Sequence, residues 1–212
     1  VLANKFTKEI PGYAVSFKNA FGEDITTQTP AQIWRLTGKA IATYLRIAVS
    51  RDAAFDRWNA GDASAMSEAA VRGFALFRGR GRCSSCHSGP FFSDFEFHNV
   101  STSLPDANGQ RADEGREHVT HAPEDGGKFL TPMLRSAAMT SPYLHDGSDT
   151  TITRLLKRKT GTRGRLDPNH DKILDSTTDL TDAELSDIVE FIKALTGKQI
   201  PIAELVGPTV FP

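Results

Sequence analysis

Apolar side chains recur every three or four residues along several parts of the chain, which is the spacing of one face of an α-helix. The longest such stripe follows Thr29 and Pro30 and runs from Ile33 to Ala48. Threonine is a suitable N-cap, and proline is favoured at the first helical position. The pattern therefore predicts a helix over residues 30–48.

Three further helices are expected from the same spacing. One begins near Ser67 and ends at Gly79, just before the two cysteines. A short one follows Thr151. The last begins with Thr181-Asp182-Ala183-Glu184, which has the form of a capping box. Gly197 stands where a glycine cap would end that helix.

The rest of the chain shows little regular pattern. Alternation of apolar and polar residues never persists, so no substantial strand is predicted. Residues 1–28 are broken by glycine and proline and are expected to be irregular. Residues 88–128 give the weakest signal, and a loop this long is uncommon unless it is functional or clamped, for example by a cofactor. The fold class is mostly α with long ordered loops.

Composition narrows the function classes. The 212 residues are 39% hydrophobic and 24% charged with a net charge of −1, so a core can form. This charge argues against nucleic-acid binding by bulk electrostatics and against a polybasic membrane surface. The chain has no apolar run of about 18 residues, so no membrane span is predicted. It has no charged-then-apolar leader either, which suggests a mature or a cytosolic chain. Two cysteines exclude a small disulfide scaffold.

The two cysteines form the most informative motif. Cys83-Ser84-Ser85-Cys86-His87 is C-x-x-C-H, the attachment site of a c-type haem. Two thiols three residues apart on one turn can reach the two vinyl groups at one edge of the porphyrin. The next residue then lies under the ring, where its imidazole can bind iron. Cys83, Cys86 and His87 are therefore predicted to bind one covalent haem c.

Three other interpretations of the cysteines are weaker. A thioredoxin-like dithiol belongs in a strand–helix–strand setting that the pattern lacks. A zinc site could recruit His118 and His121, but their two-residue gap is tighter than the usual three to five. The third interpretation is an accidental pair of structural thiols.

The chain resembles the C-terminal half of the bacterial di-haem cytochrome c peroxidase family, which includes MauG. Besides the C-x-x-C-H motif, the matching segments are Pro11 to Tyr13, Phe21-Gly22, Ser67 to Ala70, Arg72-Gly73, Phe77, residues 88–90, Phe97 to Asn99, Thr131-Pro132, Leu134-Arg135, Ser141 to Gly147 and the helix from Asp182 to Gly197. The resemblance implies a cytochrome c-like haem domain over residues 63–212. Residues 1–62 would be a helical connector that continues from, or packs on, a missing N-terminal haem domain or companion chain.

The same resemblance implies a function. In the family the N-terminal haem meets hydrogen peroxide, and the C-terminal haem relays electrons to it from a small periplasmic donor, a cytochrome c or a blue copper protein. This chain would carry the relay haem, in the periplasm. One alternative is MauG-like oxidation of a protein substrate, in which electrons flow the other way. Others are a stand-alone mono-haem electron carrier and a haem-based sensor or ligand binder.

The second axial ligand of the iron departs from the family pattern. Family members use a methionine or tyrosine 17 residues beyond the proline that corresponds to Pro142, and here that position is Lys159. A lysine amine binds iron only after losing its proton, which is costly at a reference pKa of about 10.4. The sequence leaves three interpretations open: Lys159 is the ligand, another residue such as His170 or Met139 is, or the site is open and Lys159 is a solvated charge beside it.

Other residues are assigned by the resemblance or by their chemistry. The backbone carbonyls of Thr140 and Pro142 match positions that bind calcium between the two haems of the family. Arg135 could pair with a haem propionate, since a guanidinium matches a carboxylate. His98 and His145 are expected to be structural, and Trp34 and Trp58 to be core residues rather than redox sites.

Overall fold

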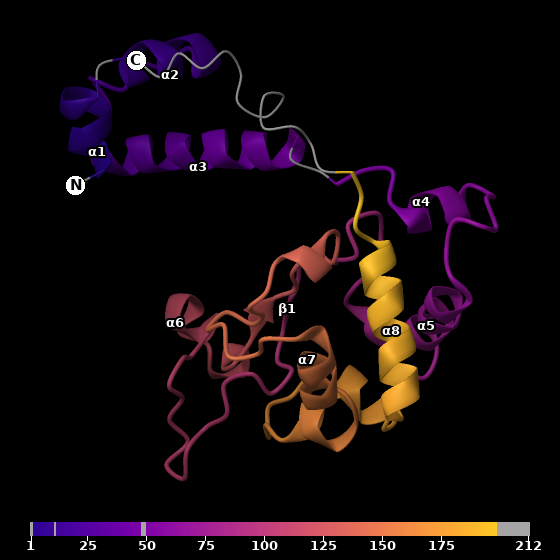
Figure 1. Ribbon diagram of the computed structural model, residues 1–212. Coiled ribbons are helices and arrows are strands. Elements are labelled where there is room, and N and C mark those ends of the chain that lie inside the picture. The colour runs from indigo at the N-terminus through magenta and orange to yellow at the C-terminus, as the bar shows by residue number, and fades with distance from the viewer. Residues whose placement is uncertain (1, 11, 48–49, 199–212) are drawn as a thin grey trace. The chain divides into compact units, whose positions relative to one another are not determined.

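The computed structural model describes residues 2–10, 12–47 and 50–198 (Figure 1). The chain divides into two compact units, which are treated separately: one contains residues 1–49 and the other residues 50–198. Among the described residues, no helix combines the length and the hydropathy that a bilayer crossing requires.

The first unit is helical throughout most of its length. Its elements are α1 (Leu2–Asn4), a π-helical turn (Lys5–Glu9), α2 (Tyr13–Phe21) and α3 (Pro30–Ile47). The helix predicted after Thr29 is confirmed, and the backbone N–H of Thr29 donates to the Gln32 side chain at 2.9 Å. Trp34 is 67% exposed, so the expectation that it lies in the core is wrong.

The expectation that residues 1–28 are irregular is also wrong. Phe6 packs against Tyr13 with ring centroids 4.6 Å apart, and Phe17 lies 5.8 Å from Phe6. Gly12 and Gly22 flank α2 with φ values of 96° and 71°, which glycine adopts without strain. Aromatic packing between neighbouring segments therefore stabilises helices that the local pattern does not predict.

The second unit contains the remaining elements. They are α4 (Ala54–Asn59), α5 (Glu68–Arg78), β1 (Phe97–His98), α6 (Glu117–Thr120), β2 (Phe129–Leu130), α7 (Ile152–Lys159), α8 (Asp182–Ala194) and 3-10 turns at Cys83–Ser85, Pro123–Asp125, Ala137–Met139, Gly161–Arg165 and Lys172–Ser176. The two strands pair antiparallel, with Phe97 opposite Leu130. The mostly α fold class with long ordered loops is confirmed.

The core of this unit lies between α5 and α8, which run side by side (Figure 1). Phe77, Ile188 and Phe191 are buried there. The helices approach so closely at Gly73 that a Cβ atom on it would lie 1.9 Å from the carbonyl oxygen of Asp187. Both helices begin at the predicted caps, since the Ser67 hydroxyl accepts from the N–H of Ala70 at 3.1 Å and Thr181 forms the expected capping box.

Gly197 does not cap α8 as predicted. The helix ends at Ala194, and the N–H of Gly197 donates to the Ser50 hydroxyl at 2.7 Å. A Cβ atom at Gly197 would lie 2.2 Å from the carbonyl oxygen of Arg51. The glycine therefore permits close approach of two backbone segments rather than a left-handed helix end.

Residues 50–62, which the sequence analysis grouped with the connector, belong to the second unit. The reason is packing: Ala54, Phe55 and Trp58 of α4 lie against the buried cluster that contains Phe77 and Phe191. Trp58 thus has the core position expected of it.

Candidate functional site

The two cysteines lie on a tight turn directly after α5. Arg82 has a φ of 55°, and a 3-10 turn follows over Cys83–Ser85. The N–H of His87 donates to the carbonyl oxygen of Cys83 at 2.9 Å, which closes one helical turn. Gly81 fits here because a Cβ atom would lie 3.0 Å from the carbonyl oxygen of Leu76 and 3.3 Å from the Cys83 sulfur. The turn thereby holds both thiols and the imidazole on one short segment.

His87 is oriented by the backbone. Its Nδ1 lies 2.9 Å from the carbonyl oxygen of Phe92, which can only accept a hydrogen bond, so Nδ1 carries the proton. Nε2 then has the free lone pair, as in metal-binding histidines whose other nitrogen donates to a carbonyl. Burial, as the largest effect, lowers the pKa of His87. A neutral, oriented imidazole is the form that binds iron, and His87 therefore fits a proximal haem ligand.

The thiols are free and are not poised for redox exchange. Burial raises the pKa of Cys83 to about 11. Burial, followed by the nearby carboxylate of Asp94, raises the pKa of Cys86 to about 12. Redox-active dithiols have the opposite property, a lowered thiol pKa. The environment thus argues against the thioredoxin-like interpretation.

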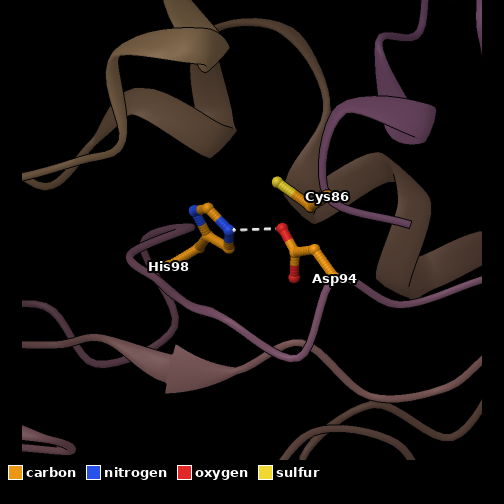
Figure 2. A group of neighbouring side chains, drawn as sticks. All are labelled: Cys86, Asp94 and His98. Carbon is orange, nitrogen blue, oxygen red and sulfur yellow. Dashed lines mark hydrogen bonds and ion pairs between the residues drawn. The ribbon is translucent and has the colours of Figure 1, made fainter. Parts of the chain in front are cut away.

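Next to Cys86 lies a histidine held between two carboxylates. Its Nε2 lies 2.9 Å from Asp94, as Figure 2 shows for His98. Its Nδ1 lies 2.5 Å from Asp171. Burial alone would lower the pKa of His98, but the hydrogen bonds to Asp171 and Asp94 outweigh it and the pKa is raised. Both ring nitrogens are occupied, in keeping with the structural role expected of His98.

The structure does not bring the two histidines of the zinc interpretation to the cysteines in the part of the chain that it describes. There, the one group of three potential metal ligands consists of Cys86, Asp94 and His98. It contains neither His118 nor His121. The side chain of His118 is 82% exposed and lies 3.3 Å from Glu114.

A pocket of about 450 Å³ opens beside His87. Phe55, Phe74, Phe77 and Phe92 are among its lining residues, and Arg135 lies at the same pocket. Aromatic walls and a cation suit a flat apolar ring with acidic side groups. The turn that carries Cys83, Cys86 and His87, with this pocket beside His87, therefore fits a haem.

Arg135 is engaged by protein groups. Its two terminal nitrogens lie 2.9 and 2.7 Å from the carboxylate oxygens of Asp56, and Nε donates to the carbonyl oxygen of Pro90 at 2.7 Å. These contacts use three of the five N–H groups that a guanidinium offers. Two N–H groups remain for a propionate.

Lys159 ends α7 with its amine turned inward. Nζ donates to the carbonyl oxygen of Val100 at 2.9 Å and to the hydroxyl of Thr102 at 2.5 Å. Burial, as the largest effect, lowers the pKa of Lys159 to about 8. A neutral amine has two N–H bonds and one lone pair, so it can keep both hydrogen bonds and still bind a metal. The side chain is therefore not the solvated charge that lysine usually is.

The two alternative ligands are less suitably placed. Met139 is 64% exposed. His170 has both ring nitrogens occupied, Nδ1 at 2.8 Å from the carbonyl oxygen of Asp167 and Nε2 at 2.7 Å from Asp175. To bind an iron, Met139 would have to leave solvent, and His170 would have to give up a hydrogen bond.

Thr140 and Pro142 lie on an exposed turn. Neither carbonyl oxygen accepts a hydrogen bond from any described residue. Calcium takes six to eight oxygen ligands. The two carbonyls could therefore form only part of a calcium site.

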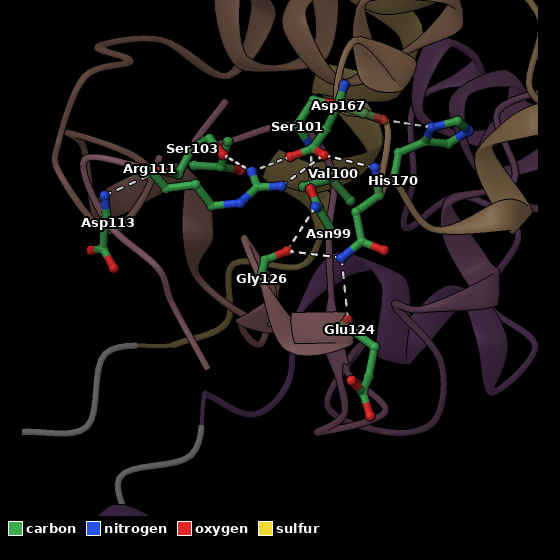
Figure 3. A network of polar contacts seen from close by, with 12 residues as sticks. Asn99, Val100, Ser101, Ser103, Arg111, Asp113, Glu124, Gly126, Asp167 and His170 are labelled. Atoms are coloured by element: carbon green, nitrogen blue, oxygen red, sulfur yellow. Dashed lines mark hydrogen bonds and ion pairs between the residues drawn. The ribbon is translucent and has the colours of Figure 1, made fainter. Parts of the chain in front are cut away.

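Protein side chains clamp the long polar loop (Figure 3). The carboxylate of Asp167 is fully buried and pairs with both terminal nitrogens of Arg111, one of them at 2.9 Å. Arg111 also donates to the carbonyl oxygen of Ser103, and the Ser101 hydroxyl donates to the carbonyl oxygen of Gly164 at 2.8 Å. Sequence reasoning missed the network because its partners are far apart along the chain.

Known proteins include some that resemble this chain in sequence and in structure. No family model matches the chain. The cytochrome-c peroxidase IdrP1 of Denitromonas iodatirespirans is 37% identical over 215 residues, covering 88% of this chain and 55% of that protein. The methylamine utilization protein MauG of Methylophilus methylotrophus is 36% identical over 209 residues, covering 95% and 57%.

Among solved structures, the diheme peroxidase BthA of Burkholderia thailandensis has a TM-score of 0.65 at 19% identity. The match covers 93% of this chain and 59% of that one, and it shows the fold. The chain thus spans just over half the length of the relatives that it matches.

Proposed function

Because the chain belongs to the same family as the cytochrome c peroxidases and MauG, we propose that it holds one covalent haem c and transfers electrons through it. The observation that carries the proposal is the turn from Cys83 to His87, which holds two thiols and an oriented imidazole on one short segment. His87 also lines an aromatic pocket. The haem, when bound, supplies an iron that gains and loses one electron at a time.

The chain's own residues bind and orient this group. Cys83 and Cys86 would form thioethers with the two vinyl groups, and Nε2 of His87 would bind the iron. The carbonyl oxygen of Phe92 holds the imidazole in the required tautomer. Arg135, anchored by Asp56, would use its remaining N–H groups for a propionate. Together these contacts would hold the haem in one orientation among apolar side chains.

We infer that this haem is a relay. Electrons from a small periplasmic cytochrome c or blue copper protein would pass through it to a second haem in a companion part of the enzyme. There hydrogen peroxide would take two electrons and two protons and form two water molecules. The similarity to MauG over 95% of this chain supports a second candidate, oxidation of a protein substrate with the electron flow reversed.

The relay is tested on the protein produced with its haem in a bacterial periplasm. The alkaline pyridine spectrum and the mass should give one covalent haem per chain. Rapid mixing with a reduced small cytochrome c should reduce this haem, and hydrogen peroxide alone should reoxidise it slowly. Absence of covalent haem would contradict the proposal. Fast peroxide turnover by this single haem would contradict the relay role.

We also propose that Lys159 is the second axial ligand of the iron. It stands at the position where the resemblance places the ligand of the family. Its amine is partly buried, and its two hydrogen bonds leave one lone pair free. The carbonyls of Thr140 and Pro142 are proposed as two ligands of a calcium ion whose other oxygens come from a companion part. This second site is incomplete in the present chain.

Replacing Lys159 with alanine is expected to change the absorption spectrum of the oxidised protein. Loss of a strong-field amine should convert a low-spin iron to a high-spin one, with a blue-shifted Soret band and a new charge-transfer band, because the iron then has a weak axial ligand. The exposed Lys172 provides a matched control, and Lys172→Ala should leave the spectrum unchanged. An unchanged spectrum in Lys159→Ala would remove Lys159 as a ligand.

A further inference from the structure

Positive charge is concentrated on one segment of a chain whose net charge is −1. Between Asp149 and Asp167 there is no acidic residue. The same stretch carries six cationic residues, Arg154, Lys157, Arg158, Lys159, Arg163 and Arg165. The segment comprises α7 and the turn Gly161–Arg165 that follows it. The proposed function uses only Lys159.

Four of these cations surround a surface pocket of about 400 Å³. Its lining residues are Thr151, Thr153, Arg154, Lys157, Arg158 and Arg163. None of them is acidic, and the two threonines add hydroxyl groups that can donate hydrogen bonds. We call this surface the cationic face of α7. Its composition suits carboxylate groups.

The charge on the cationic face is only partly neutralised within the chain. Arg154 and Arg158 share one fully buried carboxylate, that of Asp149, at 3.0 and 3.2 Å. Lys157 lies 2.7 Å from Asp182, whose side chain is 82% exposed. Arg163 forms no ion pair with any described residue. Four cations therefore share two carboxylates, and an excess of two positive charges remains.

The opposite side of α7 faces the core that holds the haem-attachment turn. Ile152 and Leu156 pack against the buried cluster of Phe77 and Phe191, and Cys83 packs against the same cluster. An α-helix with its side chains is about 10 Å thick. A partner seated on the cationic face would thus be separated from this core by a single helix.

We propose that the cationic face of α7 is the docking surface for a small redox protein with an acidic face. The proposal rests on the proposed electron-transfer function and names the kind of partner that the surface fits. Each encounter moves one electron between the partner's centre and the haem, so that one is oxidised and the other reduced while no bond changes. Complementary charge raises the association rate and orients the partner. The net charge of −1 disfavours nucleic acid as the occupant.

The test uses the double variant Lys157→Glu/Arg163→Glu in the haem-loaded protein. These two cations do not contact the buried Asp149, so reversing them leaves that carboxylate paired with Arg154 and Arg158. The protein is reduced and then mixed rapidly with an oxidised acidic blue copper protein at low ionic strength. The second-order rate constant should fall about tenfold in the variant, which is the lower end of electrostatic steering. The difference should shrink at 0.5 M salt, where charges are screened over about 4 Å.

A matched control carries the same charge change elsewhere. Lys193 lies eleven residues beyond Asp182 in α8, or about 16 Å along the helix axis. Arg51 lies at the same end, where its carbonyl oxygen accepts from the N–H of Lys198 at 3.0 Å. Arg51→Glu/Lys193→Glu should change the rate constant by less than about twofold, because steering acts locally near the docking surface.

The outcomes separate docking from the underlying function. Equal slowing in both double variants would mean that net charge, not the cationic face, sets the rate, and it would overturn the proposal. Equal rates in all three proteins would overturn it as well. Lys157→Glu/Arg163→Glu could also slow transfer to a basic small cytochrome c as much as transfer to the acidic blue copper protein. That result would indicate a damaged haem site rather than lost docking, and it would overturn the proposal. Absence of haem from all three would overturn the electron-transfer function itself.

Discussion

A variant with Cys83→Ala and Cys86→Ala is expected to lose all covalently held haem, from one per chain to none. The two sulfurs stand on one turn and are proposed to bind the two vinyl groups, so their removal leaves only His87 to hold the ring. A single imidazole bond is broken by acid, whereas thioethers are not. Haem staining of a denaturing gel and extraction into acidic acetone measure the difference directly.

The serines between the cysteines provide the matched control. Neither the Ser84 nor the Ser85 hydroxyl donates a hydrogen bond to any described residue, so Ser84→Ala/Ser85→Ala changes the same turn without a known contact. This control should keep its haem through denaturation. Haem that stays on the polypeptide in the double cysteine variant would show that attachment uses other atoms.

The parts of the fold that the sequence predicts are those fixed by local chemistry. The helices after Thr29, Ser67, Thr151 and Thr181 all begin where a side-chain oxygen can cap them. The capping partner is only three residues away in each case. Such contacts form within one segment, and a pattern of residue types therefore reveals them.

The parts that the sequence does not predict depend on distant partners. Residues 1–28 look irregular because glycine and proline interrupt them, yet Phe6, Tyr13 and Phe17 pack into one aromatic cluster that holds the helices together. Gly197 has the position of a helix cap, but its contact with Ser50 spans 147 residues. Tertiary packing in both cases overrides the local signal.

The candidate site divides in the same way. The two cysteines and the histidine of C-x-x-C-H lie within five consecutive residues, so the motif alone predicts the haem-attachment residues. The sequence does not predict the setting of Lys159, because its partners Val100 and Thr102 lie 59 and 57 residues away. The sequence predicts a propionate as the partner of Arg135, but not the bidentate pair with Asp56, which is 79 residues distant. Residue type indicates the chemistry, and only the fold supplies its partner.

Replacing Arg111 with alanine is expected to destabilise the second unit by about 3–5 kcal/mol, the usual cost of removing one partner of a buried ion pair. Asp167 is fully buried, and the side chain of Arg111 is only 9% exposed. Burial alone would raise the pKa of Asp167, but the hydrogen bonds from Arg111 outweigh it and the pKa is lowered. Without Arg111, this carboxylate would be a buried charge without its cation. The melting temperature of the haem-loaded protein should fall by roughly 10 °C.

Two further variants identify the cause of that loss. Arg72 pairs with Asp187 through two nitrogens at 2.9 Å, but its side chain is 58% exposed, so Arg72→Ala should cost no more than about 1 kcal/mol. Adding Asp167→Asn to Arg111→Ala removes the buried charge and should recover part of the lost stability, because a neutral amide is less costly to bury than a carboxylate. An Arg111→Ala melting temperature equal to that of Arg72→Ala would show that the pair does not clamp the loop, since a solvated pair behaves in that way. Full stability of the loop would then have to come from the neighbouring hydrogen bonds of Asn99 and Ser101.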